Sequence, residues 1–145
     1  FTLVEIMVVV VIIGLLSSVA VPAFQKIQNS AKMGRLANDF RVYTSAMMTF
    51  SLEQGYYPED SNSGDIPTGM ADYISVARWN KGPSIGGVWD VEKDGADFIS
   101  AIGVHRHDVN DAFLQEFDEK YDDGDLSSGV FMKIVGDRYY WIVAR

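Results

Sequence analysis

An uninterrupted apolar segment at the start of the chain limits the folds that are open to it. Residues 1–24 read FTLVEIMVVVVIIGLLSSVAVPAF and contain one formal side-chain charge, that of Glu5. A helix of this length reaches about 36 Å, which exceeds the roughly 30 Å hydrocarbon core of a bilayer. We expect a helix over residues 1–25 that is covered by lipid or by other apolar helices. A cleavable signal peptide is disfavoured, because the segment lacks a basic start and continues into an amphipathic helix.

Glu5 distinguishes this segment from a simple membrane anchor. A carboxylate inside a bilayer-spanning helix costs about 2.5–3.5 kcal/mol on insertion scales, so it needs a compensating partner. The nearest cation is the α-ammonium of Phe1, and in a neighbouring copy shifted along the helix axis it would lie beside Glu5. The sequence therefore predicts that Glu5 pairs with Phe1 of another copy and that this pair sets the register of assembly.

Further along the segment, Gly14 and Pro22 weaken the helix. Pro22 has no N–H, and its ring clashes with the carbonyl of Ser18. We expect the helix to be loosened or kinked between Gly14 and Pro22, and continuous helical density through these residues in a filament would refute this.

These residues resemble the N-terminus of mature type IV pilins and type II secretion pseudopilins. Such subunits begin with Phe, have Glu at the fifth position, and continue with an apolar run broken by Gly and Pro. The resemblance is close over residues 1–25 and includes Phe1, Glu5, Gly14 and Pro22. It implies a leader peptide that a prepilin peptidase removes before Phe1, with N-methylation of Phe1 by the same enzyme.

The resemblance also implies a location and partners. The subunit would reside in the bacterial inner membrane, and a membrane machine would assemble it into a homopolymer. A pilus would extend from the cell surface, whereas a pseudopilus would remain in the periplasm.

Residues 26–54 continue the helix with an amphipathic pattern. Apolar residues recur at spacings of three and four, which predicts a helix face that packs on a core. This face comprises Met33, Leu36, Phe40, Tyr43, Met47 and Phe50. The opposite face is expected to carry Lys32, Arg35, Asp39, Thr49 and Glu53. Gly55 and Pro58 are expected to end the helix near residue 53.

Residues 55–145 are predicted to form a globular α+β head. A short helix is expected around Pro67–Ile74, a second over Asn110–Tyr121 with Asn110 as its N-cap, and strands at Val88–Glu92, Ala96–Ile99, Val130–Val135 and Arg138–Val143. Lys93-Asp94-Gly95 and Gly136-Asp137 are the expected hairpin turns. The predicted fold class is type IV pilin-like: a long hydrophobic N-terminal α-helix packed on a roughly four-stranded antiparallel sheet.

Two groups of residues suggest metal chemistry. Asp122, Asp123 and Asp125 concentrate carboxylates in a loop that contains Gly, and calcium prefers such oxygen ligands. The alternative is a solvated acidic turn, since the spacing departs from that of an EF-hand. His105 and His107 would share one face of an extended segment as half of a transition-metal site, but a surface loop is favoured because no third ligand is evident. No other cofactor and no catalytic motif is expected.

Charge restricts the class of partner. The chain has a net charge of −8 and no cysteine, and residues 55–145 hold eight basic and seventeen acidic side chains. Such a surface does not favour direct binding of nucleic acid. The function predicted is a structural filament subunit, with a major pseudopilin of type II secretion as the alternative. A membrane-anchored binding module or enzyme is a third hypothesis, but it lacks a convergent polar site.

Overall fold

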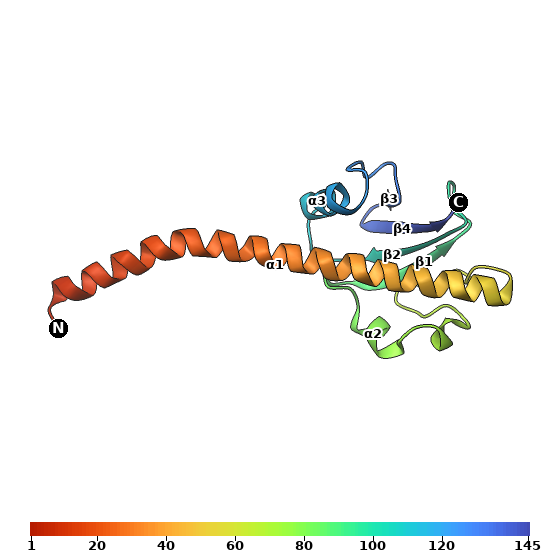
Figure 1. The fold of residues 1–145 in the computed structure, drawn as a ribbon, viewed down its shortest axis with the longest axis horizontal. Coiled ribbons are helices and arrows are strands. Elements are labelled where there is room, and N and C mark those ends of the chain that lie inside the picture. The colour runs from red at the N-terminus through yellow and green to blue at the C-terminus, as the bar shows by residue number, and fades with distance from the viewer. The chain divides into compact units, whose positions relative to one another are not determined.

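The computed structural model describes all of residues 1–145 and divides them into two compact units, Phe1–Lys32 and Met33–Arg145. One long helix, α1 (Leu3–Gln54), contributes to both units (Figure 1). It ends at the glycine that the sequence indicated: Gly55 has φ of 84°, and its N–H donates to the carbonyl of Ser51 at 2.9 Å. The other helices are η1 (Met70–Asp72), α2 (Val76–Lys81) and α3 (Asp111–Tyr121).

Four strands form one antiparallel sheet in the second unit. They are β1 (Val88–Lys93), β2 (Ser100–His105), β3 (Phe131–Val135) and β4 (Arg138–Ala144), in the spatial order β1-β2-β4-β3. The hairpin of β3 and β4 turns through Gly136-Asp137 as predicted, and Gly136 takes a positive φ of 59° that favours glycine. The α+β fold class is therefore confirmed.

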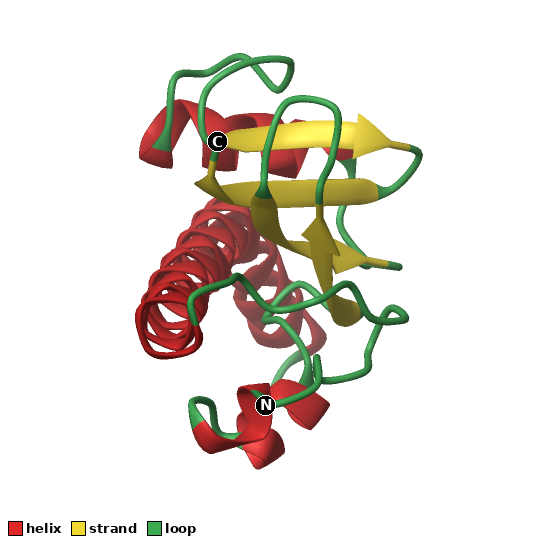
Figure 2. Cartoon of the chain, turned by 90° about the vertical axis from the view of Figure 1, so that its right-hand side faces the viewer, coloured by secondary structure: helices red, strands yellow, loops and turns green.

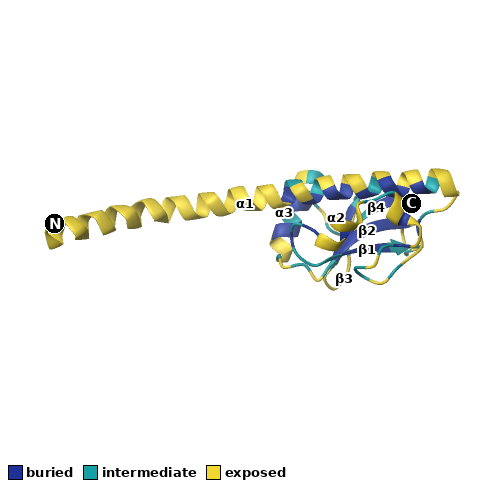
Figure 3. Cartoon of the chain, turned by 90° about the horizontal axis from the view of Figure 1, so that it is seen from below, coloured by how far each residue is buried: buried dark blue, intermediate teal, exposed yellow.

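The core of the second unit lies between α1 and one face of the sheet (Figure 2). All six residues of the predicted apolar face of α1 are buried, and the buried residues of this helix lie on the side that faces the rest of the second unit (Figure 3). Phe40 is fully buried at the centre of this core. Its ring lies 5.6–6.1 Å from the rings of Trp89, Phe117, Phe131 and Trp141. One side chain thus joins α1 to three strands and to α3.

The predicted strand Ala96–Ile99 and its three-residue turn are wrong. Lys93 pairs with Ser100, so residues 94–99 form the connection and β2 begins only at Ser100. Phe98 folds back and packs with Ala101, Tyr140 and Ile142 on the sheet face opposite α1. Because β2 is covered on both faces, it lacks the alternation that marks a half-exposed strand.

The placement of Asp39 on the exposed face of α1 is also wrong. Asp39 is only 9% exposed, and its carboxylate forms an ion pair with Arg78 of α2. The sequence did not predict α2, and the short helix expected around Pro67–Ile74 is reduced to the 3-10 turn η1. Trp79 anchors α2 beside α1, because its buried ring packs against that of Tyr43 at 5.3 Å; its Nε1 donates to the carbonyl of Gly64 at 2.9 Å.

Candidate assembly site and cation site

The first unit has no core of its own. Every residue from Phe1 to Lys32 is exposed, and the large apolar side chains between Leu3 and Ile27 are 50–75% exposed. By length and composition, α1 is able to cross a membrane. A contiguous apolar surface of this extent is unfavourable in water, so lipid or other protein chains must cover it.

Glu5 lies in the first turn of α1, where it closes a capping box with Thr2. Its Oε2 accepts hydrogen bonds from the Thr2 N–H at 2.6 Å and from Thr2 Oγ1 at 3.0 Å. In return, Thr2 Oγ1 accepts from the Glu5 N–H at 3.3 Å. This reciprocal pattern satisfies backbone donors that the start of a helix leaves unpaired. The spacing Thr-x-x-Glu is a sequence signature of this cap, so Glu5 has a role within its own chain besides the intermolecular one predicted for it.

The capping box leaves part of Glu5 available for assembly. Glu5 Oε1 has no partner in the chain, and the Phe1 ammonium makes no ion pair with Glu5 of its own chain. An ionised carboxylate has about four acceptor positions, so a cap and an ion pair are compatible at one side chain.

Gly14 and Pro22 lie within an unbroken α1 in the isolated chain. Ser18 turns its hydroxyl onto the backbone, donating from Oγ to the carbonyl of Leu15 at 2.7 Å. The loosening expected between Gly14 and Pro22 concerns the filament, and it stays a prediction.

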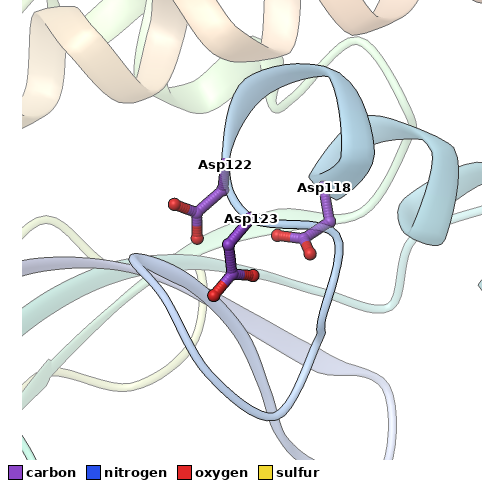
Figure 4. Close-up of side chains that lie close together, drawn as sticks. All are labelled: Asp118, Asp122 and Asp123. Carbon is purple, nitrogen blue, oxygen red and sulfur yellow. The ribbon is translucent and has the colours of Figure 1, made fainter.

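A group of three carboxylates occupies the end of α3 and the loop that follows. Asp118, Asp122 and Asp123 present oxygens that all lie within 4.8 Å of one another (Figure 4). The helix that positions Asp118 was predicted correctly: Asn110 caps it by accepting from the Phe113 N–H at 3.0 Å, and Phe113, Leu114 and Phe117 are buried.

Backbone and hydroxyl donors hold the two loop members of this group. Asp122 Oδ2 accepts from the N–H groups of Val130 and Phe131, the latter at 2.7 Å. Asp123 accepts from the Asp125 N–H at 2.9 Å and from Ser128 Oγ at 2.8 Å. These bonds fold the loop so that its carboxylates face Asp118.

Asp118 is the member of the group that the sequence did not identify. It is fully buried, and neither of its oxygens has a hydrogen-bond partner. Burial raises the pKa of Asp118 to about 6, and the carboxylates of Asp122 and Asp123 add to the rise. The Gly124 N–H opposes this effect without reaching hydrogen-bond geometry. A buried carboxylate without a donor is costly, and a bound cation would compensate it.

The donor set fits a hard cation, with one change from the expected ligands. Asp125 lies outside the group, because its carboxylate accepts from the N–H and hydroxyl of Ser127. Gly129 allows the loop to close over the group: a Cβ there would lie 2.2 Å from Asp122 Oδ2. Oxygen ligands of this kind suit calcium.

The two histidines do not form a common site. His105 ends β2, with Nδ1 bonded to Ser63 Oγ at 2.9 Å and Nε2 3.1 Å from Asp137. His107 bonds instead through Nδ1 to the carbonyl of Val109 at 2.9 Å. Arg106 between them has φ of 60°, so the segment is not extended and the assumption of a shared face is wrong.

Comparison with known proteins identifies relatives of one kind. The chain is 32% identical over 72 residues to a type IV major pilin protein, PilE1, of Neisseria gonorrhoeae. It is 34% identical over 84 residues to prepilin peptidase-dependent protein D of Escherichia coli. It is 33% identical over 85 residues to type II secretion system core protein G of Pseudomonas aeruginosa.

These matches cover about half of the chain. They span 44% of the length of the gonococcal pilin and 58% of each of the other two proteins. No family model and no solved structure matches the chain. The relatives include both pilins and a secretion pseudopilin, and the long apolar helix on a four-stranded antiparallel sheet is the arrangement expected of both. The chain is thus similar to type IV pilins and type II secretion pseudopilins over about half of its length, and its fold is consistent with that of a type IV pilin.

Proposed function

We propose that this chain is a structural subunit that polymerises through α1 into a type IV pilus-like extracellular filament. The observation that carries the proposal is the apolar segment, whose large side chains are at least half exposed in the isolated chain and which contains one carboxylate, Glu5. In the membrane, lipid covers this surface. In the filament, the same segment of other copies covers it, so assembly exchanges one apolar environment for another.

The pair of Glu5 with Phe1 of a neighbouring copy makes this exchange specific. Removing one partner of a buried ion pair costs about 3–5 kcal/mol, because it leaves an uncompensated charge. Copies that pack in a register in which Glu5 does not reach the Phe1 of a neighbour are therefore disfavoured. We also propose that a prepilin peptidase generates and N-methylates Phe1, which is supported by the relative whose name records dependence on that peptidase. A membrane assembly machine is the other expected partner.

A major pseudopilin of a type II secretion system is the second candidate. One relative is named as a core protein of a type II secretion system, and the carboxylate group at Asp118 supports a subunit whose head requires calcium. In this alternative the same contacts of α1 would build a periplasmic filament that serves secretion.

A cryo-EM reconstruction of filaments from cells that express the chain tests the proposal. We expect residues 1–24 to form the filament interior, with each Glu5 carboxylate within about 4 Å of a neighbouring Phe1 nitrogen. The helix should be loosened between Gly14 and Pro22. A Glu5 that faces water would contradict the pairing. Fibres outside wild-type cells would indicate a pilus, whereas filaments confined to the periplasm would indicate a pseudopilus.

The calcium site has its own test, the melting temperature of the chain in detergent with and without calcium. At a calcium concentration one hundred times Kd, binding adds about 2.7 kcal/mol of stability, which raises the melting temperature by roughly 10 °C. Asp118→Asn removes the buried charge, so we expect a melting temperature without calcium at least equal to that of the wild type, and no response to calcium. Glu119→Gln changes an exposed neighbouring carboxylate and should leave the response intact. A wild-type protein that calcium does not stabilise would indicate a solvated acidic turn.

A further inference from the structure

The sheet face opposite α1 carries a polar pocket that neither candidate site uses. On β1, Trp89 and Val91 point into the core, so the alternate residues Asp90 and Glu92 point to the other face. The pocket has a volume of about 410 Å³ and lies between β1, the ends of β2 and β4, and the loop around residue 61. Its titratable lining residues are Asp60, Asp90, Glu92, His105, Arg106 and Arg138.

Part of this charge is already compensated within the chain. Asp90 is only 2% exposed; it accepts a hydrogen bond from the Tyr140 hydroxyl and lies 3.9 Å from Arg138 Nη1. His105 is engaged by Ser63 and Asp137, as described above. These contacts hold Asp90 and His105 in the lining of the pocket.

Glu92 is a carboxylate of the pocket that forms no ion pair within the chain. No cation lies within 4 Å of its carboxylate, and its one hydrogen bond is a 3.5 Å contact from the Tyr140 hydroxyl. Burial raises the pKa of Glu92, and the nearby carboxylates of Asp60 and Asp90 raise it further, whereas Arg138 lowers it. Three carboxylates and two guanidinium groups line the pocket, so its acidic side chains outnumber its arginines by one.

We propose that this pocket binds an organic cation, an ammonium or guanidinium group that pairs with Glu92 and Asp60. The cation has two sources with the same chemistry, a small free molecule or a basic side chain of a second copy. Arg35 and Arg41 supply the second source, because both are exposed on α1 and neither forms an ion pair within the chain. This second source rests on the proposed polymer, whereas binding of a free cation does not.

The first experiment needs no polymer. Full-length chain in a nonionic detergent is titrated with n-butylguanidinium and followed by NMR, with butyrate as the anionic control probe. We expect shifts to concentrate on β1, β4 and the loop around residue 61, and butyrate to cause none. Charged hydrogen bonds contribute about 1.5–3 kcal/mol, so Glu92→Gln should weaken binding about tenfold or more. Glu116→Gln, an exposed change of equal charge on α3, should leave the dissociation constant unchanged.

The second experiment identifies the source. Glu92→Arg should reduce filament yield if a basic side chain of a second copy fills the pocket. Adding Arg35→Glu or Arg41→Glu to the Glu92→Arg chain should then restore the yield, because the two partners exchange their charges. Butylguanidinium binding with no effect of Glu92→Arg on assembly supports a free cation. Two results together overturn the proposal. In the titration, the probe does not bind, or it binds Glu92→Gln as well as the wild type. In the assembly assay, neither charge reversal restores filaments. A chain that forms no filament refutes the proposed polymer, and the titration still decides the pocket.

Discussion

Replacing Glu5 by Ala should abolish filaments while the head remains folded. The change removes the carboxylate that we propose to pair with the Phe1 ammonium of a neighbouring copy. The loss of about 3 kcal/mol or more at each contact lowers the association constant more than a hundredfold. Electron microscopy and a sedimentation assay measure the filaments. Intrinsic fluorescence of Trp79, Trp89 and Trp141 reports the fold, because all three lie in the second unit, away from Glu5.

Two further variants separate pairing from helix capping, since Glu5 also binds Thr2. Glu5→Gln keeps an oxygen acceptor for the Thr2 N–H but removes the charge, so it should lose filaments as Glu5→Ala does. Thr2→Val removes the hydroxyl of the capping box and keeps the carboxylate, so filaments should persist. The reverse result, with Glu5→Gln assembling normally and Thr2→Val failing, would show that Glu5 serves the helix start and not the contact between copies.

The second large effect is expected at Phe40, where substitution by Ala should destabilise the head by about 3–5 kcal/mol. Phe40 is fully buried and contacts four aromatic rings from α3 and the sheet, so its loss leaves a cavity that rigid neighbours cannot fill. Since domains of this size are stable by about 5–15 kcal/mol, the variant is expected to be partly unfolded near physiological temperature. Urea unfolding of the full chain in detergent, followed by tryptophan fluorescence, measures the change.

Phe24→Ala is the matched control for Phe40→Ala. Phe24 is 60% exposed in the first unit, so the same atoms are removed without opening a cavity in the head. The free energy of unfolding of the Phe24→Ala variant should therefore equal that of the wild type, although the change can reduce assembly. A cost below about 1 kcal/mol for Phe40→Ala would mean that the core closes over the missing ring, against the packing described above.

Local features of the fold were predictable because they depend on residues close in sequence. The apolar face of α1, the Asn110 cap of α3 and the Gly136-Asp137 turn all follow from spacings of two to four residues. The same holds for the apolar first segment with Glu5, which by itself indicated a chain that needs other copies or lipid. The capping role of Glu5 is equally local, because it follows from the Thr-x-x-Glu spacing.

Only the tertiary structure determined which polar groups lose water. Asp39 and Arg78 are 39 positions apart and meet because α2 covers that side of α1; Glu92 and Tyr140 meet because β1 and β4 flank β2. Asp118 lies within an ordinary helical pattern, and its pKa rises because the fold buries it and brings the carboxylates of Asp122 and Asp123 close to it. The charge state and partners of a carboxylate depend on burial by distant segments, which sequence spacing does not encode. The sequence thus determined how the chain is divided and which segment needs lipid or other copies to cover it, whereas the fold determined which of its acids are available to a cation.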